Sequence, residues 1–482
     1  MIRPDLSTSS TCSHDKQICV VGSGPNGLAA AIALAQAGLR VNVFEGTASI
    51  GGCARAAEST LPGFIHDTGS AVHPMAAISP FFNTLRLADH GLVWKELPAA
   101  LAHPMDDGSC ALLLKSILDT SATLGKDAPA YRRLIRPLME ERENLLPYLL
   151  GRLRWPQHPL SLARFGLNAM QSAVFLAHRF QSERTRGFIA GLCAHSILPL
   201  DEWPSAAYGL ALALAGHTAG WPLPKGGSGK ISAALASYLK SLGGTITTGK
   251  FIENMDDLPE EATILWDITP AQLLRIKGLN LPDGYRSSLE GYRYGPGVFK
   301  MDWALSEPIP WKARECKLAG TVHLGGTFDE IALSESCAWR CEDAPKPFVL
   351  LVQPSLFDPS RAPAGKHTAW AYCHVPNGFN GDMTAAIEAQ VERFAPGFRE
   401  VILARHTAGP ADLEKDNPNL VGGDISGGAQ TLWQLFARPA LLRDPYKIPG
   451  ANMFLCSSST PPGAGVHGMC GFHAAASCLK NM

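Results

Sequence analysis

Three glycines near the start of the chain have the spacing of a phosphate-binding loop. In the string VVGSGPNGLAA they are Gly22, Gly24 and Gly27. The first glycine of such a loop permits a tight turn, the second lets the backbone approach a pyrophosphate, and the third lets a helix pack on a strand. Glu45 ends the next apolar run, where a carboxylate can accept hydrogen bonds from ribose hydroxyls. Together these residues predict a dinucleotide-binding site.

A strand, a turn and a helix must hold this loop in place. Residues 18–21 are apolar and rich in β-branched side chains, which is typical of a buried parallel strand. Pro25 and Asn26 open the following helix, where the missing N–H of a proline costs nothing. Residues 27–37 predict a helix buried on most sides, and residues 41–44 predict the second strand. This order favours a dinucleotide site over a buried turn without a ligand.

A second group of glycines and an arginine follows the acidic residue. Gly46 comes directly after Glu45, and the pair Gly51 and Gly52 precedes Arg55. Glycines can bring backbone close to the same pyrophosphate, and the arginine can supply positive charge. Taken alone, the stretch is equally consistent with a glycine turn and a solvated arginine.

The C-terminal segment can bring a helix N-terminus to the same site. Residues 453–456 predict a strand and residues 461–465 a glycine-proline loop, and an alanine-rich helix is expected to begin near Gly468 and Met469. A helix N-terminus presents free N–H groups and a partial positive charge, so it can stabilise negative charge on a bound ring system. The alternative is a strand and helix that only complete the sheet.

In this order the motifs resemble those of the flavin amine oxidase and phytoene desaturase superfamily, including its pyridine nucleotide-disulfide oxidoreductase domain 2-like members. The string GAGVHGMCG resembles the closing motif of phytoene desaturase-like proteins, although serines at 457–459 stand where these proteins usually have a glycine. Three further positions match the segment after the arginine: Gly63, Asp67 and Gly69. The resemblance implies FAD as the cofactor, with Phe251 and Ile252 beside its adenine.

The resemblance also implies an α/β fold in which a Rossmann-type FAD-binding domain interlocks with an α+β substrate domain. The FAD-binding domain is expected in three pieces, residues 1–74, 224–285 and 446–482. The substrate domain is expected in two pieces, a mostly helical one at residues 75–223 and a sheet-containing one at residues 286–445.

Flavin chemistry on a C–H bond needs a proton acceptor as well as a hydride acceptor. His73 and His467 lie in segments that the resemblance places against the flavin, although either can be a structural histidine. Lys300 lies in a segment that resembles the substrate-domain strand of flavin amine oxidases, whose lysine holds a water near flavin N5. The alternative is an ordinary exposed strand lysine. Asp302 is two residues further on and therefore shares a strand face with Lys300.

A basic and apolar stretch, residues 144–182, contains four arginines and no acidic residue. The arginines are Arg152, Arg154, Arg164 and Arg179. One interpretation is a helical layer of the substrate domain with solvated arginines. The other is an interfacial patch through which a lipophilic substrate enters from a membrane.

Composition argues against several other classes of protein. Lys plus Arg total 42 and Asp plus Glu total 43, so a net charge of -1 gives no electrostatic reason to expect nucleic acid as a partner. The twelve cysteines lack paired metal-ligand spacing, which favours free thiols in a reducing cytosol over a zinc site, and no metal is expected. The sequence has neither a signal-peptide pattern in its first 17 residues nor an apolar run of about 18 residues. We therefore expect a cytoplasmic protein.

The sequence favours an organic substrate as the electron source. It contains neither a second strand, GxGxxG loop and helix for NAD(P)H nor a CxxxxC redox pair. The favoured hypothesis is an FAD-dependent dehydrogenase or desaturase of a lipophilic or polycyclic small molecule, reoxidised by oxygen or a quinone. A redox-neutral flavin-dependent isomerase is the first alternative. The second is a non-catalytic lipid-binding protein on the same fold, as in Rab GDP-dissociation inhibitors. The oligomeric state is left open.

Overall fold

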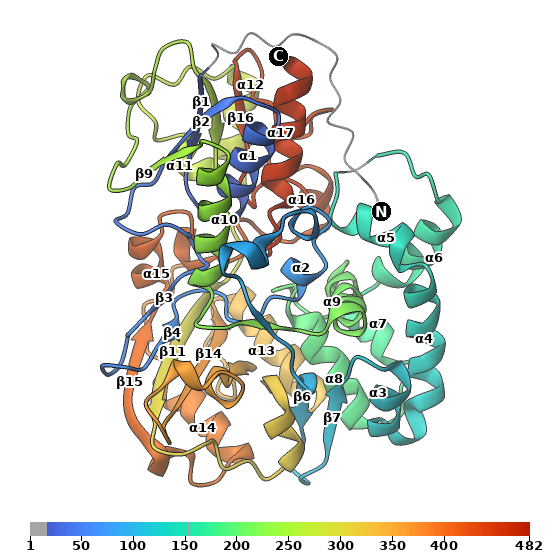
Figure 1. Ribbon diagram of the computed structural model, residues 1–482. Helices are drawn as coiled ribbons and strands as arrows, with labels where there is room; N and C mark the ends of the chain where they lie inside the picture. Colours follow the sequence, from blue (N-terminus) through green and yellow to red (C-terminus); the bar gives the residue numbers. More distant parts are fainter. Residues whose placement is uncertain (1–16, 153) are drawn as a thin grey trace.

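The strand before the glycine loop lies at the centre of a five-stranded parallel sheet. The computed structural model describes residues 17–152 and 154–482. The strand order is β16–β10–β1–β2–β9, and each neighbouring pair is parallel. The strands are β1 (Gln17–Val21), β2 (Arg40–Phe44), β9 (Thr245–Thr247), β10 (Thr263–Trp266) and β16 (Met453–Leu455). Stretches far apart in the sequence thus build one sheet (Figure 1).

Helices bury both faces of this sheet. One face carries α1 (Pro25–Gln36), α10 (Gly229–Ser241) and α17 (Met469–Asn481), and the other carries α11 (Pro270–Leu273) and α12 (Asp283–Glu290). Alternate side chains of a strand point to opposite faces. Ile18 and Val20 accordingly pack with the first group of helices, and Cys19 and Val21 pack with the second. A strand buried on both sides must be apolar throughout, as β1 is.

A second, seven-stranded sheet occupies the lower half of the molecule in Figure 1. Its order is β15–β11–β14–β13–β12–β6–β7, and only the β12–β6 pair is parallel among the described strands. The strands are β6 (Ala99–Pro104), β7 (Cys110–Leu113), β11 (Gly297–Leu305), β12 (Ala319–Leu324), β13 (Val349–Val352), β14 (His367–Val375) and β15 (Ile402–Ala408).

The two faces of the second sheet pack against different helices. One face packs against α4 (Ala128–Glu140), α8 (Glu183–Ala194), α9 (Ser205–Ala219) and α13 (Phe328–Arg340), and the other against α14 (Thr384–Phe394). Along β11, Phe299, Met301 and Trp303 face α14. Because the side-chain period of a strand is two, Val298 and Lys300 lie on the opposite face, toward α8 and α9.

Shorter elements connect and flank the two sheets. Two short antiparallel pairs are β3 (Ala56–Ala57) with β4 (His66–Asp67), and β5 (Trp94–Lys95) with β8 (Leu223–Pro224). The remaining α-helices are α2 (Pro74–Ala77), α3 (Ile117–Thr123), α5 (Arg142–Leu149), α6 (Pro159–Ala169), α7 (Ala173–Ala177), α15 (Pro410–Asp416) and α16 (Leu432–Phe436). The 3-10 turns are η1 (Phe82–Thr84), η2 (Leu87–His90), η3 (Gly125–Asp127), η4 (Met255–Asp257), η5 (Arg314–Leu318), η6 (Pro354–Leu356), η7 (Pro359–Arg361), η8 (Phe398–Val401) and η9 (Val421–Gly423).

The architecture confirms the expected fold class, a Rossmann-type parallel sheet beside an α+β unit. One difference concerns residues 75–223, which also give β6 and β7 to the second sheet. The β6 sequence AALAHP is rich in alanine, so its own β-propensity is low and pairing with β12 decides its conformation. Within the described residues, no helix combines the length and apolarity that a bilayer span requires.

Candidate functional site

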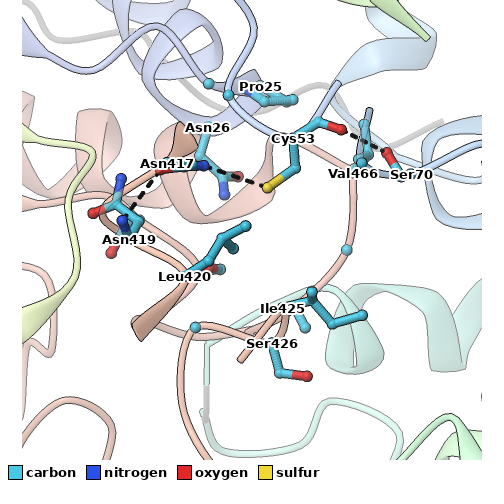
Figure 2. Close-up of a pocket in the computed structure, with 18 of the residues that line it drawn as sticks. Pro25, Asn26, Cys53, Ser70, Asn417, Asn419, Leu420, Ile425, Ser426 and Val466 are labelled. Atoms are coloured by element: carbon cyan, nitrogen blue, oxygen red, sulfur yellow. Dashed lines mark hydrogen bonds between the residues drawn. The ribbon is translucent and has the colours of Figure 1, made fainter. Parts of the chain in front are cut away.

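One cavity joins the two sheets. Its volume is about 890 Å³, and it runs from the loops at the carboxyl ends of β1, β2 and β10 to the helix-covered face of the second sheet. Loops at the carboxyl ends of parallel strands are the usual ligand site of such a sheet. Figure 2 shows the part beside the start of α1, where Pro25 and Asn26 lie near Cys53 and the loop that carries Asn417 and Leu420.

The glycine loop is tightly packed at the start of α1. Gly22 has a φ of +103°, a conformation that residues with a Cβ rarely adopt. A Cβ atom on Gly27 would lie 2.2 Å from the carbonyl oxygen of Gly22, so glycine is required for α1 to begin this close to the strand. Gly24 precedes the helix, and Pro25 lies in its first turn. Gly24, Pro25 and Asn26 line the cavity, which places the positive end of the helix dipole beside any bound anion.

Glu45 lies at the end of β2, where it lines the cavity. Its Oε2 accepts hydrogen bonds from the backbone N–H (3.1 Å) and the hydroxyl (2.5 Å) of Ser23. Its Oε1 accepts from the backbone N–H and the hydroxyl of Thr47, both at 2.9 Å. These four bonds hold the carboxylate in one orientation beside the glycine loop.

The predicted glycine pair approaches the first glycine loop. A Cβ atom on Gly52 would lie 3.3 Å from the Cα of Gly24, so the two backbones are in close contact. Gly51 has a φ of +119°. The Arg55 Nε–H donates to the Gly52 carbonyl oxygen (2.8 Å), and its guanidinium also pairs with Asp416. Arg55 lines the cavity, with part of its charge offset by Asp416.

The segment after β9 brings an aromatic side chain against Gly46. A Cβ atom on Gly46 would lie 2.6 Å from the Phe251 ring, so glycine allows this contact. Phe251 is 55% exposed and Ile252 is buried, and both line the cavity at the glycine-loop end.

Asp267, at the end of β10, is a site residue that the sequence analysis missed. The Gly27 N–H donates to its Oδ2 (2.9 Å), and the carboxyl also lies against Gly24. Burial, assisted by the nearby charge of Glu45, raises the pKa of Asp267 to about 8 in spite of these N–H groups. The side chain is therefore largely neutral at pH 7 and adds little negative charge beside a bound phosphate. An aspartate directly after an apolar strand was the available signal.

A loop from the second half of the chain, residues 416–420, lines the cavity beside the start of α1 (Figure 2). The Asn417 side-chain amide donates to Cys53 Sγ (3.5 Å), and Asn419 Oδ1 accepts from the backbone N–H of Thr269 (2.9 Å). These contacts join the loop to the segments after β2 and β10. Sequence patterns do not indicate these contacts, because they depend on tertiary packing.

The loop before α17 also lines the cavity, through Gly465, Val466 and His467. Burial lowers the pKa of His467 to about 4, so the ring is neutral at pH 7. The Met469 N–H donates to its Nδ1 (3.0 Å), which leaves the ring hydrogen on Nε2 and argues against a role as a base. Gly468 and Met469 lie behind this loop and do not line the cavity, since Gly468 packs closely against α1 and η1.

His73 lines the cavity within a hydrogen-bonded network. Its Nε2 lies 2.8 Å from the Ser228 hydroxyl, and that hydroxyl donates to the Ser70 carbonyl oxygen (2.5 Å). The Ser228 hydroxyl must therefore accept from His73, which places the hydrogen on Nε2. Burial lowers the pKa of His73 to about 4, and its Nδ1 is enclosed by protein. The arrangement supports a structural role.

Lys300 lines the cavity from the second sheet and is only 4% exposed. It is thus not an ordinary exposed strand lysine. Its Nζ lies 2.5 Å from Asp302 Oδ2 and 5.7 Å from the centre of the Trp370 ring. His66 and His406 lie within 3.8 and 3.4 Å of the same carboxyl group. Burial lowers the pKa of Lys300, and Asp302 opposes this effect. The cavity wall therefore contains a buried ion pair.

Comparisons with known proteins agree with this arrangement. A family model described as an NAD(P)-binding Rossmann-like domain matches residues 20–86. Pyridine nucleotide-disulfide oxidoreductase domain-containing protein 2 of Mus musculus is 27% identical, over 96% of this chain and 94% of its own length. A 4,4'-diapophytoene desaturase (4,4'-diapolycopene-forming) of Methylomonas sp is 23% identical, over 76% of this chain and 75% of its own length. These similarities support the superfamily that the sequence motifs resemble, that of the flavin amine oxidases and phytoene desaturases.

Solved structures of other proteins share the fold of this chain. An oxidoreductase from Methanosarcina mazei superposes with a TM-score of 0.65 at 15% identity, over 96% of this chain and 100% of its own. A putrescine oxidase bound to putrescine superposes with a TM-score of 0.63 at 17% identity, over 97% and 98% of the two chains. These superpositions show the shared fold. The related oxidoreductases and desaturases, together with the matched family model, indicate an oxidoreductase with a nucleotide-binding Rossmann-like domain. Across the described residues, no group of three or more His, Cys, Asp or Glu side chains could hold a metal ion.

Proposed function

We propose that this oxidoreductase binds FAD and transfers a hydride from a lipophilic or polycyclic small molecule to flavin N5, with oxygen or a quinone as the electron acceptor. The observation that carries the proposal is the single cavity that connects the glycine loop with an apolar chamber on the second sheet. Leu212, Trp221, Leu350 and Val352 are among the walls of this chamber. An apolar pocket with a few polar groups is typical of a small-molecule site.

The residues at the glycine-loop end fit FAD. The contact between Gly52 and Gly24 forms a cradle that a Cβ atom would obstruct, and the start of α1 provides a positive dipole for a pyrophosphate. When bound, FAD supplies the hydride acceptor. The protein's own contributions are to orient the ribose through Glu45, to exclude water with the apolar chamber and to place the Lys300 charge on its wall.

The direct test is to denature the purified protein and identify the released nucleotide. We expect FAD rather than FMN or NAD. Anaerobic mixing of the yellow protein with apolar candidate substrates is then expected to bleach the flavin. A colourless protein that cannot be reconstituted with FAD contradicts the proposal, and product formation without net electron transfer would indicate an isomerase.

Glu45→Gln is expected to weaken FAD binding by about 1.5–3 kcal/mol, or roughly ten- to hundred-fold, because a charge-assisted hydrogen bond to the ribose is lost. Titration of apoprotein with FAD, followed by flavin fluorescence, measures the change. Glu58→Gln is the matched control, since Glu58 is exposed and lies outside the cavity lining. Equal affinities in both variants would show that Glu45 does not bind the nucleotide.

We also propose peripheral membrane contact through residues 144–182. Exposed apolar side chains gather there: Trp155 is 94% exposed, Leu160 85% and Leu167 73%. Leu149 and Leu150 in the same stretch line the cavity, so this surface adjoins the substrate chamber. Apolar side chains beside arginines are typical of a surface that binds anionic lipid.

Co-sedimentation with anionic vesicles is expected at low salt and should weaken as salt screens the exposed charges. Changing all four arginines of this stretch to glutamine should remove most of the binding. Arg86→Gln with Arg136→Gln, two exposed arginines elsewhere, should leave it intact. Binding that is absent at low salt would make residues 144–182 a structural layer only.

A further inference from the structure

Tyr372 presents a polar atom without a partner to the apolar chamber. The residue lies on β14, lines the cavity and is 9% exposed. Among the described residues, none is hydrogen-bonded to its hydroxyl, and the hydroxyl oxygen is not enclosed by protein. It therefore opens into the cavity. Tyr285 is a contrasting case, because its unpartnered hydroxyl is fully enclosed and lies outside the cavity lining.

The surrounding sheet fixes the orientation of Tyr372. Lys300 and Leu350 stand directly opposite it on the two neighbouring strands, so all three side chains share one face. Its ring packs edge-on against Trp370, with centroids 5.2 Å apart, and lies 5.6 Å from His374. Burial raises the pKa of Tyr372 well above its usual value. The hydroxyl thus stays protonated and can donate a hydrogen bond.

His195 contributes a second donor to the same chamber. Its Nε2 lies 3.1 Å from the Nε2 of His323, so one of these nitrogens carries the shared hydrogen. The His323 Nδ1 is enclosed by protein and has no hydrogen-bond partner. Enclosed N–H groups without acceptors are rarer than enclosed lone pairs without donors, so this nitrogen carries no hydrogen. His323 therefore donates from Nε2, and His195 carries its hydrogen on Nδ1. Burial lowers the pKa of His195 to about 3, so the ring is neutral, and it lines the cavity.

The chamber offers no unpaired charge to a ligand. Lys300, the cation on its sheet wall, is paired with Asp302. None of the described second-sheet residues that line the cavity is acidic. A buried carboxylate or ammonium ion without a partner is strongly disfavoured. The chamber therefore suits a neutral acceptor.

We propose that the substrate of this oxidoreductase carries a neutral hydrogen-bond-accepting oxygen, such as a carbonyl, on an apolar skeleton, and that the Tyr372 hydroxyl and the His195 N–H bind this oxygen. The inference rests on the proposed function, which makes the chamber the substrate site. A pure hydrocarbon leaves both donors unpaired, and a site built to bond an oxygen rejects an analogue that lacks it.

The test compares the binding of two isosteric probes to the protein as purified. The probes are 2-acetylnaphthalene and 2-isopropenylnaphthalene, in which a methylene group replaces the carbonyl oxygen. Anaerobic calorimetric titration should show the ketone binding at least about tenfold more tightly. Tyr372→Phe keeps the ring packing and should reduce this preference to less than about threefold, whereas Tyr285→Phe should leave it unchanged.

Three results would overturn the inference: equal binding of both probes to the unmodified protein, an unchanged preference in Tyr372→Phe, or tighter binding of the cationic probe 2-(2-naphthyl)ethylamine at pH 7. The proposed function fails separately, through a protein without FAD or a flavin that no substrate bleaches. Because the titration requires no turnover, a retained preference for the ketone in such a protein would uphold the oxygen site and reject only the redox role.

Discussion

Asp67→Ala is expected to lower the free energy of unfolding by about 3–5 kcal/mol, because it leaves a buried arginine without its counter-charge. Asp67 Oδ2 lies 2.7 Å from the Arg361 guanidinium, and both side chains are fully buried. Asp67 Oδ1 also accepts from the Ser228 N–H (2.7 Å). One carboxylate thus joins β4, η7 and the loop before α10. Urea unfolding followed by tryptophan fluorescence measures the loss.

Three further variants separate the effect of this buried pair from a general surface effect. Arg361→Ala should cost a similar amount, and the double variant should cost clearly less than the two single losses added together. Glu140→Ala, which breaks the exposed pair with Arg136, should cost less than about 1 kcal/mol. If Asp67→Ala lowers the free energy of unfolding by as little as Glu140→Ala does, the buried pair does not hold the three segments together.

The sequence predicted the parts of the fold that local patterns determine. The β1 strand, the glycine loop and α1 follow from an apolar run, three glycines and an alanine-rich helix, each within a few residues of the next. Gly52 could be placed near Gly24 only through the family resemblance, and the structure brings their backbones together. The shared strand face of Lys300 and Asp302 followed from the two-residue period of a strand, and the structure pairs the two side chains.

Contacts between distant segments could not be predicted from single motifs. Asp267 meets Gly27 because β10 lies beside β1, and that strand order is a property of the whole sheet. Asn417 reaches Cys53 for the same kind of reason. The chemical state of His467 depends on one N–H of the following helix, and a sequence pattern does not specify that geometry. Tyr372 gave no signal, since a tyrosine in an apolar strand is usually core.

Lys300 is the catalytic candidate with the clearest electrostatic consequence. Its ammonium group is buried on the cavity wall beside Asp302 and close to the Trp370 ring. A fixed positive charge in a dry cavity stabilises negative charge that develops nearby far better than a solvated lysine does. If FAD extends from the glycine-loop end of the cavity to Lys300, as the amine oxidase resemblance implies, this charge favours electron transfer from reduced flavin to oxygen.

Lys300→Met keeps much of the apolar stem and removes the charge, but it also leaves Asp302 buried beside His66 and His406 without its cation. We expect the single variant to lose about 3–5 kcal/mol of stability. Lys300→Met combined with Asp302→Asn removes both charges and should recover most of that loss. The double variant is therefore the one in which to measure chemistry.

In the double variant we expect flavin reoxidation by oxygen to slow by at least about tenfold, which corresponds to roughly 1.4 kcal/mol of barrier, while FAD content stays normal. Reduction and reoxidation must be followed separately in single turnovers, because a steady-state rate combines them. Lys317→Met, at an exposed position, should match the unmodified protein in both half-reactions. If the double variant has the same reduction and reoxidation rates as the unmodified protein, the ion pair only stabilises the second sheet. Lys300 then does not assist the reaction of reduced flavin with oxygen.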